Sequence, residues 1–235
     1  MTTSRDFSFT QIGVIRTPFD SKFAVPRQPS LAPSTRGVIV LDEGYSDPNY
    51  VLGLERCSHI WLSFVFHLVG ASSKPTVRPP RLGGNERVGV FATRSTHRPN
   101  PLGLSVVRLD RVEHKARTEL HVSGVDLVNG TPILDIKPYA PYVDSVNHAE
   151  YALADNQPDR LQVTWSQAAS NSFESIKPSL VLIDKVAVEQ ILAQDPRPSY
   201  HSDDSRVYGV SLEGVEFKFR VTNNEVIIQT VETPC

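Results

Sequence analysis

Apolar and polar residues alternate in short runs through the first 136 positions, and this pattern predicts strands. Proline, glycine and asparagine separate the runs, as is usual for turns. One short helix is indicated between them, with Asp47 as its N-cap, Pro48 as its first residue and Leu54 at its end. The seven predicted strands are residues 8–16, 37–41, 59–68, 87–93, 104–112, 119–125 and 133–136.

The order of these elements limits the fold. Strands that follow one another with almost no helix exclude a doubly wound sheet, and no Gly-x-Gly-x-x-Gly fingerprint follows a strand. A twisted antiparallel sheet hides its edges by closing on itself. We therefore expect a mainly β fold, with a small closed or nearly closed antiparallel β-barrel in the first part of the chain.

The last third of the chain has a different pattern. Residues 146–159 are polar and irregular, which indicates a linker. Beyond it, apolar residues at helical spacing predict a helix over residues 178–193, and Glu213-Gly214 and Asn223-Asn224 predict hairpin turns. The strands predicted here are residues 161–165, 206–212, 215–222 and 225–231. Two domains are expected, a barrel at 1–150 and a small C-terminal α+β domain at 151–235.

Length and composition narrow the class of protein. The chain has 235 residues and no run of eighteen apolar residues, and Arg5 and Asp6 interrupt the start that a secretory signal needs. We therefore expect a soluble, cytoplasmic protein that does not contact a membrane. The two cysteines, Cys57 and Cys235, provide neither a disulfide framework nor a set of metal ligands, and no metal is expected.

The net charge of −2 conceals a basic segment. Residues 74–108 contain seven basic side chains and one acidic side chain, Glu86. A concentrated basic segment in an otherwise acidic chain is typical of a protein that holds one polyanion in one orientation. The simpler interpretation is a solvated charged face, but the five prolines of this segment argue against charges that merely decorate a helix.

The segment 91–105, FATRSTHRPNPLGLS, contains the most informative part of this basic segment. Pro99 and Pro101 stiffen the loop and push the residues before them toward extended backbone. Arg94 and Arg98 present planar, permanently charged groups that suit a phosphate or a carboxylate. From these residues alone, an anion-binding loop and an ordinary basic surface loop are about equally good interpretations.

Six motifs occur in order along nearly the whole chain. They are residues 25–29 (VPRQP), 64–67 (FVFH), 78–84 (RPPRLGG), 91–105, 126–132 (DLVNGTP) and 195–200 (DPRPSY). Together they resemble the TsaA/TrmO family, whose members are S-adenosylmethionine-dependent tRNA methyltransferases that act on the threonylcarbamoyl-adenosine beside the anticodon. The resemblance implies S-adenosyl-L-methionine as cofactor, bound on a barrel, the tRNA anticodon loop as partner, and a homodimer.

The resemblance also assigns residues to the methyl donor. Without it, residues 25–29 are best interpreted as a proline-rich connection, and His67 as a core histidine. With it, the candidate donor-binding residues are Pro26, Arg27, Gln28, His67, Leu68, Arg94, Leu104, Asp126, Leu127, Val128 and Asn129.

Methyl transfer explains which motifs are absent and which residues matter. A sulfonium transfers its methyl group by in-line displacement, so the protein aligns two reactants and excludes water instead of supplying a nucleophile. No local hydrolase, zinc-protease or P-loop motif occurs. The threonylcarbamoyl group carries a carboxylate, for which Arg98, Arg197 or Arg94 is the expected partner. Tyr200 or a loop tyrosine is expected to stack on the base, and Asp195 to orient Arg197 or to accept a proton.

Two other functions remain open from the sequence. A non-catalytic RNA-binding β-barrel that senses the modified anticodon loop shares the basic segment and the aromatic residues, and lacks only the donor pocket. A small-molecule methyltransferase of the same fold would act without RNA. On the residues alone, 195–200 is better interpreted as a turn that stops a helix, and the role of His97 is left open.

Overall fold

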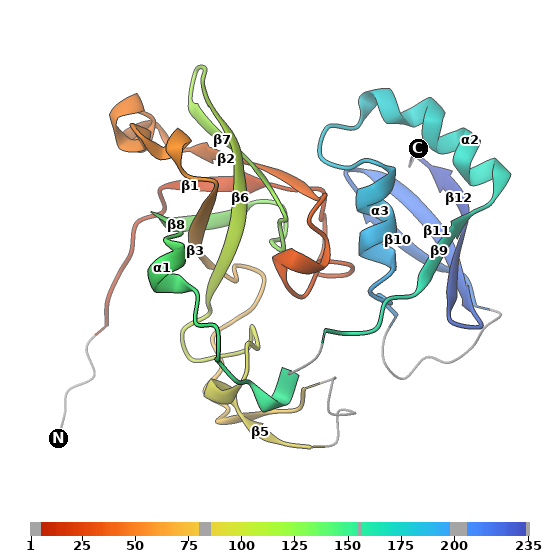
Figure 1. The fold of residues 1–235 in the computed structure, drawn as a ribbon, viewed down its shortest axis with the longest axis horizontal. Coiled ribbons are helices and arrows are strands. Elements are labelled where there is room, and N and C mark those ends of the chain that lie inside the picture. Colours follow the sequence, from red (N-terminus) through yellow and green to blue (C-terminus); the bar gives the residue numbers. More distant parts are fainter. Residues whose placement is uncertain (1–5, 80–85, 155–156, 198–205, 234–235) are drawn as a thin grey trace.

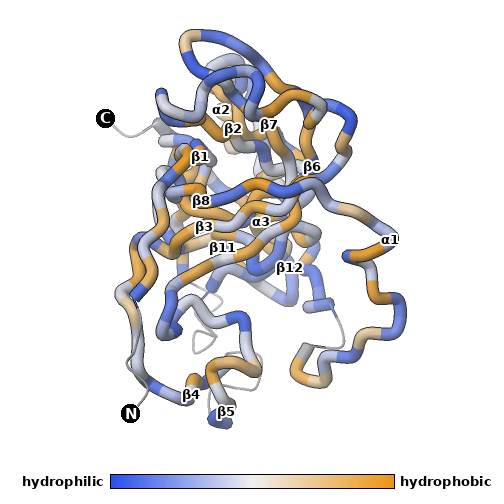
Figure 2. Tube along the Cα trace, turned by 90° about the vertical axis from the view of Figure 1, so that its left-hand side faces the viewer, coloured by the Kyte–Doolittle hydropathy of each residue, from blue (hydrophilic) through white to orange (hydrophobic). Residues whose placement is uncertain are grey.

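The computed structural model describes residues 6–79, 86–154, 157–197 and 206–233, which form two β-rich parts side by side (Figure 1). Apolar residues concentrate on the strands in the middle of the molecule, and hydrophilic residues on the outer loops (Figure 2). Among the described helices, none is long and apolar enough to span a membrane.

The first part is a closed antiparallel barrel with the strand order β1-β2-β7-β6-β3-β8. Its strands are β1 (Gly13–Arg16), β2 (Arg36–Leu41), β3 (His59–Val65), β6 (Leu102–His114), β7 (Thr118–Ser123) and β8 (Thr131–Pro138). They correspond to six of the seven predicted strands, so the mainly β fold with a barrel is confirmed. A short ribbon of β4 (Thr76–Val77) and β5 (Val88–Gly89) lies beneath the barrel in Figure 1.

The barrel closes around alternating side chains. Ile60, Leu62 and Phe64 of β3 are buried, whereas the residues between them are half-buried. Phe64 lies directly over Gly103 of β6, because a Cβ atom at position 103 would come within 2.2 Å of the Phe64 ring. The close approach of β3 and β6 at this level therefore requires glycine at position 103.

Antiparallel order gives the barrel two distinct ends. The loops 17–35, 66–101 and 124–130 leave the same end, which we call the site end. The opposite end, called the far end, is covered by residues 42–58 with three 3₁₀ turns: Glu43–Tyr45, Pro48–Val51 and Leu54–Arg56. The single helix predicted over 47–54 is therefore wrong. Asp47 does cap its first turn, but Gly53 adopts a left-handed φ of 89°, which interrupts a helix.

The second part is a four-stranded sheet with the order β10-β11-β12-β9, in which β9 runs parallel to β12. Both predicted hairpin turns are present: Glu213-Gly214 and Asn223-Asn224 each have positive φ at both positions, as type I′ turns need. The bounds are β9 (Gln162–Trp165), α2 (Gln167–Ile176), α3 (Lys185–Leu192), β10 (Tyr208–Leu212), β11 (Val215–Thr222) and β12 (Glu225–Glu232). The predicted α+β part is confirmed.

Three predicted elements need correction. The strand predicted over 87–93 pairs only at Val88–Gly89, because Val90–Ala92 forms a 3₁₀ turn. The helix predicted over 178–193 begins at Lys185, where the side chain of Asp184 accepts a hydrogen bond from the backbone of Ala187. The first strand begins at residue 13 instead of residue 8, since residues 6–12 lie outside the strand.

Candidate functional site

The candidate donor-binding residues converge at the site end of the barrel. Pro26, Arg27 and Gln28 follow β1, His67 and Leu68 follow β3, and residues 126–129 follow β7; Arg94 precedes β6 and Leu104 lies near its start. Strand alternation alone does not place these five segments together. The strand order places them together, because all of them lie in or next to the loops at the same end of the barrel.

Two of these segments are joined by hydrogen bonds. The hydroxyl of Thr17 donates to the Leu127 carbonyl over 2.8 Å, and the Thr17 N–H donates to Asn129 Oδ1 over 3.2 Å. The Asn129 N–H donates in turn to the Phe19 carbonyl over 2.9 Å. The start of the loop that carries residues 26–28 is therefore joined to the segment 126–129, and we call the joined residues 17–19 and 126–129 the wall.

Burial decides which of the candidate side chains are available to a ligand. Leu127 is 2 % exposed and belongs to the barrel core, so only its backbone is available. Pro26 is buried, whereas Arg27 is exposed. His67 and Leu68 are both exposed, which excludes the interpretation of His67 as a core histidine. Exposure at the open end of the barrel leaves His67 accessible to a ligand.

Asp126 is the most unusual group at the site end. Its Oδ1 atom is shielded from water and has no hydrogen-bond partner among the described residues. The Ser105 hydroxyl of β6 and the charge of Arg94 both act to lower the pKa of this carboxyl group. Burial outweighs both and raises the pKa of Asp126 to about 6. A buried acceptor with unused bonding capacity is typical of a binding site.

Two arginines of the 91–101 loop, Arg94 and Arg98, lie at the same end of the barrel, and they are held differently. One Nη atom of Arg94 donates to the Leu104 carbonyl over 3.3 Å, which joins the 91–101 loop to β6. Arg98 is half-buried, and its Nη1 donates to the carbonyls of Thr93 and Ser95, each over 3.4 Å. Arg98 therefore shapes its own loop, and this bonding engages only one of its three nitrogen atoms.

The described residues of the DPRPSY motif, 195–197, belong to the second part of the molecule, after α3. Asp195 has a left-handed φ of 48° and binds Arg197 through two parallel hydrogen bonds of 2.8 Å. This geometry fits the predicted role of Asp195 in orienting Arg197. Tyr200 lies outside the described residues.

Sequence reasoning missed Ser105 and the support of the wall. Ser105 is 3 % exposed and occupies an inward position of β6, where the alternation predicts an apolar residue. A polar residue at such a position is a signal that the sequence did contain. Thr17, 3 % exposed, is a second buried hydroxyl of this kind.

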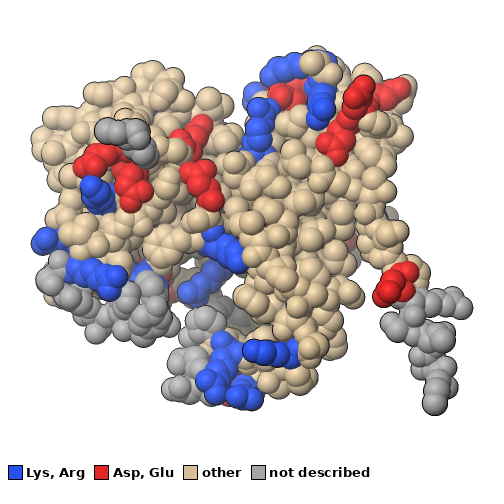
Figure 3. Space-filling model, turned by 180° about the vertical axis from the view of Figure 1, so that it is seen from behind, with Lys and Arg blue, Asp and Glu red and all other residues tan. Residues whose placement is uncertain are grey.

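Charged side chains are unevenly spread over the surface. Lys and Arg gather over the lower loops and in the space between the two parts, where few acidic side chains are seen, and a further basic group at the top of the barrel lies beside acidic side chains (Figure 3). This distribution agrees with the basic segment seen in the sequence.

A cavity of about 620 Å³ lies at the far end, and none of the candidate residues lines it. Tyr45, Tyr50 and Val51 contribute to its walls together with Ile12 and Leu41. Residues 42–57 around it contain four acidic and one basic side chain, which does not suit a polyanion. This cavity at the far end is therefore not the candidate site.

Taken together, the geometry defines a class: a closed antiparallel barrel with a candidate ligand site in its end loops and an α+β part beside it. Comparison with known proteins identifies the family. Residues 14–145 match the tRNA-methyltransferase O N-terminal domain, and residues 158–234 match the TrmO C-terminal domain. The protein belongs to the TrmO family, so the resemblance seen in the sequence is confirmed.

Individual relatives agree with this membership. The tRNA (adenine(37)-N6)-methyltransferase of Escherichia coli is 44 % identical over 225 residues, which cover 92 % of this chain and 94 % of the relative. A crystal structure of TrmO from Pseudomonas aeruginosa is 38 % identical with a TM-score of 0.83, over 97 % of this chain and 99 % of that one. An S-adenosyl-L-methionine-binding protein of Archaeoglobus fulgidus is 36 % identical over 139 residues, covering 59 % of this chain and 94 % of the relative.

Proposed function

We propose that this protein transfers a methyl group from S-adenosylmethionine to the exocyclic nitrogen of threonylcarbamoyl-adenosine beside the anticodon of tRNA. Support comes from the family and from relatives named tRNA (adenine(37)-N6)-methyltransferase. The observation that carries the proposal is the convergence of five chain segments at the site end, where the shielded carboxyl group of Asp126 also lies.

The residues at the site end suit the donor chemically. Asp126 offers a shielded acceptor atom for which the described part of the chain supplies no partner, and such an atom suits a hydroxyl or ammonium group. Arg27, His67 and Arg94 are exposed around the same end. When bound, the donor supplies an electrophilic methyl group. The protein's own contribution is to hold the donor by the backbone of residues 126–129 and the loop of residues 26–28, and to exclude water.

Recognition of the modified base depends on arginines. We propose that Arg98 or Arg197, or else Arg94, pairs with the threonylcarbamoyl carboxylate, and that Tyr200 stacks on the base. The Asp195–Arg197 pair supports this role, because the two hydrogen bonds fix the plane of the guanidinium group. Deprotonation of the exocyclic nitrogen, which lies between a purine and a carbonyl, then needs only a weak base.

The proposal extends to domain organisation and assembly. We assign residues 1–150 to a donor-binding barrel and 151–235 to a substrate-recognition domain; the Archaeoglobus relative, whose length matches little more than the barrel, supports this division. Exposed apolar side chains at the site end, Leu68, Phe91, Leu102 and Leu104, support a homodimer. Action on tRNA favours a cytoplasmic enzyme.

Methyl transfer to two tRNA samples, prepared with and without the threonylcarbamoyl group, tests the proposal. We expect donor-dependent methylation of the modified tRNA alone. Equal methylation of both samples would contradict the proposed substrate. Tight binding of modified tRNA, with no S-adenosylmethionine binding detected by calorimetry at millimolar concentration, would indicate a non-catalytic sensor. Activity on a small molecule without RNA would indicate the third function.

A further inference from the structure

The loop between β1 and β2, residues 17–35, carries the proposed donor contacts 26–28 and lies between the barrel and α3 (Figure 1). The start of this loop is joined to residues 127–129 by the hydrogen bonds described above. Its other side is fastened to the C-terminal part at two places. We call these places the turn anchor and the helix anchor.

The turn anchor joins the start of the loop to the β10–β11 hairpin. The Glu213 N–H donates to the Pro18 carbonyl over 2.8 Å, and Phe19 forms an isolated antiparallel bridge with Leu212. Both Phe19 and Leu212 are fully buried. The two parts of the molecule therefore share one apolar core at the point where the loop begins.

Asp20 completes the turn anchor. Its Oδ2 atom accepts hydrogen bonds from the Ser211 hydroxyl over 3.0 Å and from the Gly214 N–H over 3.2 Å. Glu213, between these two donors, caps a second segment: its carboxylate accepts from the N–H groups of Val181, Leu182 and Ile183. The hairpin is thus tied both to the loop and to the chain that leads into α3.

The helix anchor joins the end of the loop to α3 and the residues before it. The Ser34 N–H donates to Gln190 Oε1 over 2.8 Å, and the Arg36 N–H donates to the Leu182 carbonyl over 3.1 Å. The Arg36 guanidinium also pairs with Asp184, the N-cap of α3, at 2.9 Å. Both ends of the loop are therefore held by the C-terminal part.

Between the anchors the backbone adopts an unfavourable conformation. Ala24 has a left-handed φ of 67°, which a residue with a Cβ atom adopts only at a cost. Such conformations persist where the surrounding structure determines them, and they cluster at functional loops. Pro26, two residues later, is buried.

We propose that the C-terminal part positions the donor-binding loop, so that the two anchors and the affinity for S-adenosylmethionine are thermodynamically coupled. Asp20 and Gln190 are then positioning residues that act on the donor through residues 24–28. This inference rests on the proposed function, which assigns residues 26–28 to the donor. Linkage makes the coupling reciprocal: the donor must stabilise the anchors as much as the anchors stabilise the bound donor.

Matched variants of the full-length chain test each anchor. Asp20→Ala removes the acceptor of two hydrogen bonds, whereas Asp20→Asn keeps a side-chain oxygen. Gln190→Leu leaves the Ser34 N–H without its acceptor, whereas Gln190→Glu keeps one. By calorimetry with S-adenosylmethionine, we expect Asp20→Ala and Gln190→Leu to bind roughly 3- to 10-fold more weakly, and the conservative variants to bind within about twofold of the wild type. The KM for the donor should rise in the same two variants, with kcat at saturating donor unchanged.

Hydrogen exchange provides the reciprocal measurement on the wild-type protein. Addition of S-adenosylmethionine should slow exchange in residues 208–216, which carry the turn anchor, and leave residues 225–232 of β12 unchanged. If the wild type binds the donor, but Asp20→Ala and Gln190→Leu bind it equally well and exchange at 208–216 does not change, the coupling is wrong. A wild type that binds no donor, or an Arg27→Ala variant that binds with wild-type affinity, would instead overturn the proposed donor site and the inference with it.

Discussion

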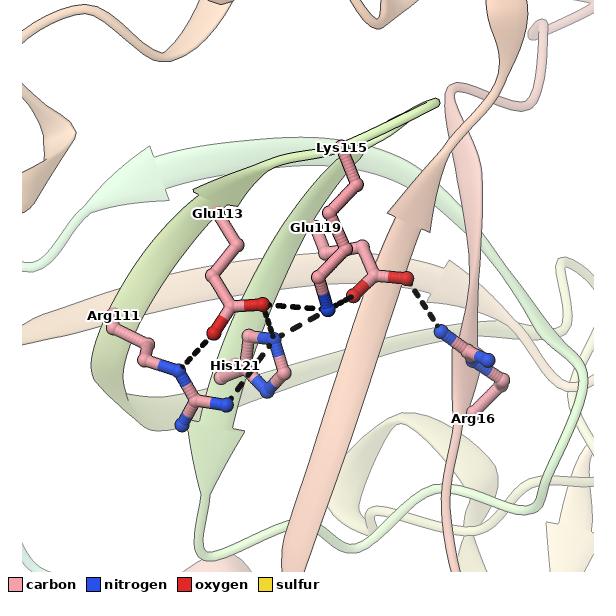
Figure 4. Close-up of polar contacts among 6 residues, drawn as sticks. All are labelled: Arg16, Arg111, Glu113, Lys115, Glu119 and His121. Atoms are coloured by element: carbon pink, nitrogen blue, oxygen red, sulfur yellow. Dashed lines mark hydrogen bonds and ion pairs between the residues drawn. The ribbon is translucent and has the colours of Figure 1, made fainter.

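Two groups of ionisable side chains lie near opposite ends of β6 and β7, and they differ in how far their bonding capacity is used. At the site end, Asp126 keeps a shielded Oδ1 atom without a partner among the described residues. Toward the far end, Glu113, Glu119 and His121 lie close enough together to suggest a metal site (Figure 4). Residue type alone would favour the second group as the functional centre.

The contacts reverse that preference. Lys115 Nζ lies between the two glutamates, 2.6 Å from Glu113 and 3.0 Å from Glu119, where a metal ion would lie (Figure 4). Arg111 pairs with Glu113 at 2.5 Å, and Arg16 with Glu119 at 2.7 Å. The basic side chains of this group satisfy its acids, whereas the carboxyl group of Asp126 is only partly satisfied.

The pKa values of the two acids express the same difference. Hydrogen bonds from Lys115 and Arg111 lower the pKa of Glu113 to about 2, and burial raises the pKa of Asp126 to about 6. A carboxylate that is paired with neighbouring basic side chains has a structural role. A carboxylate that is buried away from water without enough partners is a candidate for binding a ligand. Unused bonding capacity therefore identifies the site better than the number of acids.

Removal of one arginine beside each group of acids should give the largest difference in S-adenosylmethionine binding between the two groups. Arg94→Ala should weaken S-adenosylmethionine binding about 10- to 100-fold, because the mutation removes a charged hydrogen-bonding group, the guanidinium, beside a shielded carboxyl group. Arg111→Ala is the matched control, since it removes an arginine that is also exposed and whose partner is Glu113. Calorimetry on both variants is the measurement, and equal losses would mean that the two groups do not differ in function.

Arg98 allows a second comparison, between recognition of the modified base and binding of the methyl donor at the site end. Arg98→Ala should lower the rate of methyl transfer to modified tRNA at least about tenfold, because a charge-assisted pair in a water-excluded site is lost. Arg197→Ala should have a similar effect. Donor affinity should change less than the rate, since both arginines are assigned to the threonylcarbamoyl carboxylate. Wild-type rates in both variants, measured under single-turnover conditions, would show that the anion is bound elsewhere.

How much of this could be predicted depended on whether a feature is local. The alternation in β3 and the Glu213-Gly214 and Asn223-Asn224 turns are set by neighbouring residues, and the sequence located them correctly. Helix α2 was missed because only Ala169 and Phe173 are buried along it, which is too weak a period to detect. Leu180 is apolar but has an extended backbone. Its place in the apolar pattern made the predicted helix begin at residue 178, before its true start at residue 185.

The site shows the same limit. The motifs supplied the residues, but the convergence of five segments depends on strand order, which spacing does not reveal. Ser105 acts on the pKa of Asp126 only because β6 and the segment after β7 meet at the site end. The anchors of the β1–β2 loop join residues 18–36 to residues 182–214, a separation that no local pattern describes.

Asp126→Asn tests the buried acid through pH. A pKa raised from 3.8 in the unfolded chain to about 6 in the folded protein means that the stability contributed by protonated Asp126 is fully present below about pH 4. This contribution is lost as the pH rises through about 6. Relative to Asp126→Asn, the wild type should therefore lose free energy of unfolding over this window, by no more than about 3 kcal/mol.

Denaturant unfolding of both proteins at several pH values between 4 and 7 is the measurement, with Asp110→Asn, an exposed carboxylate on β6, as control. The control should follow the wild-type curve. Parallel curves for wild type and Asp126→Asn would show that Asp126 has its ordinary pKa in the folded protein.

The smallest effect is expected at Glu113. Glu113→Gln and Lys115→Met should leave methyl transfer unchanged and lower Tm only slightly, since exposed ion pairs contribute little and are screened by salt. Because the pKa of Glu113 is lowered, its contribution to stability is present above about pH 4.5 and lost as the pH falls through about 2. The Tm difference between wild type and Glu113→Gln should therefore shrink as the pH falls through this range. A chelator that lowers the wild-type Tm but not that of Glu113→Gln would instead show that Glu113, Glu119 and His121 hold a metal, and that the contrast between the two groups of acids is wrong.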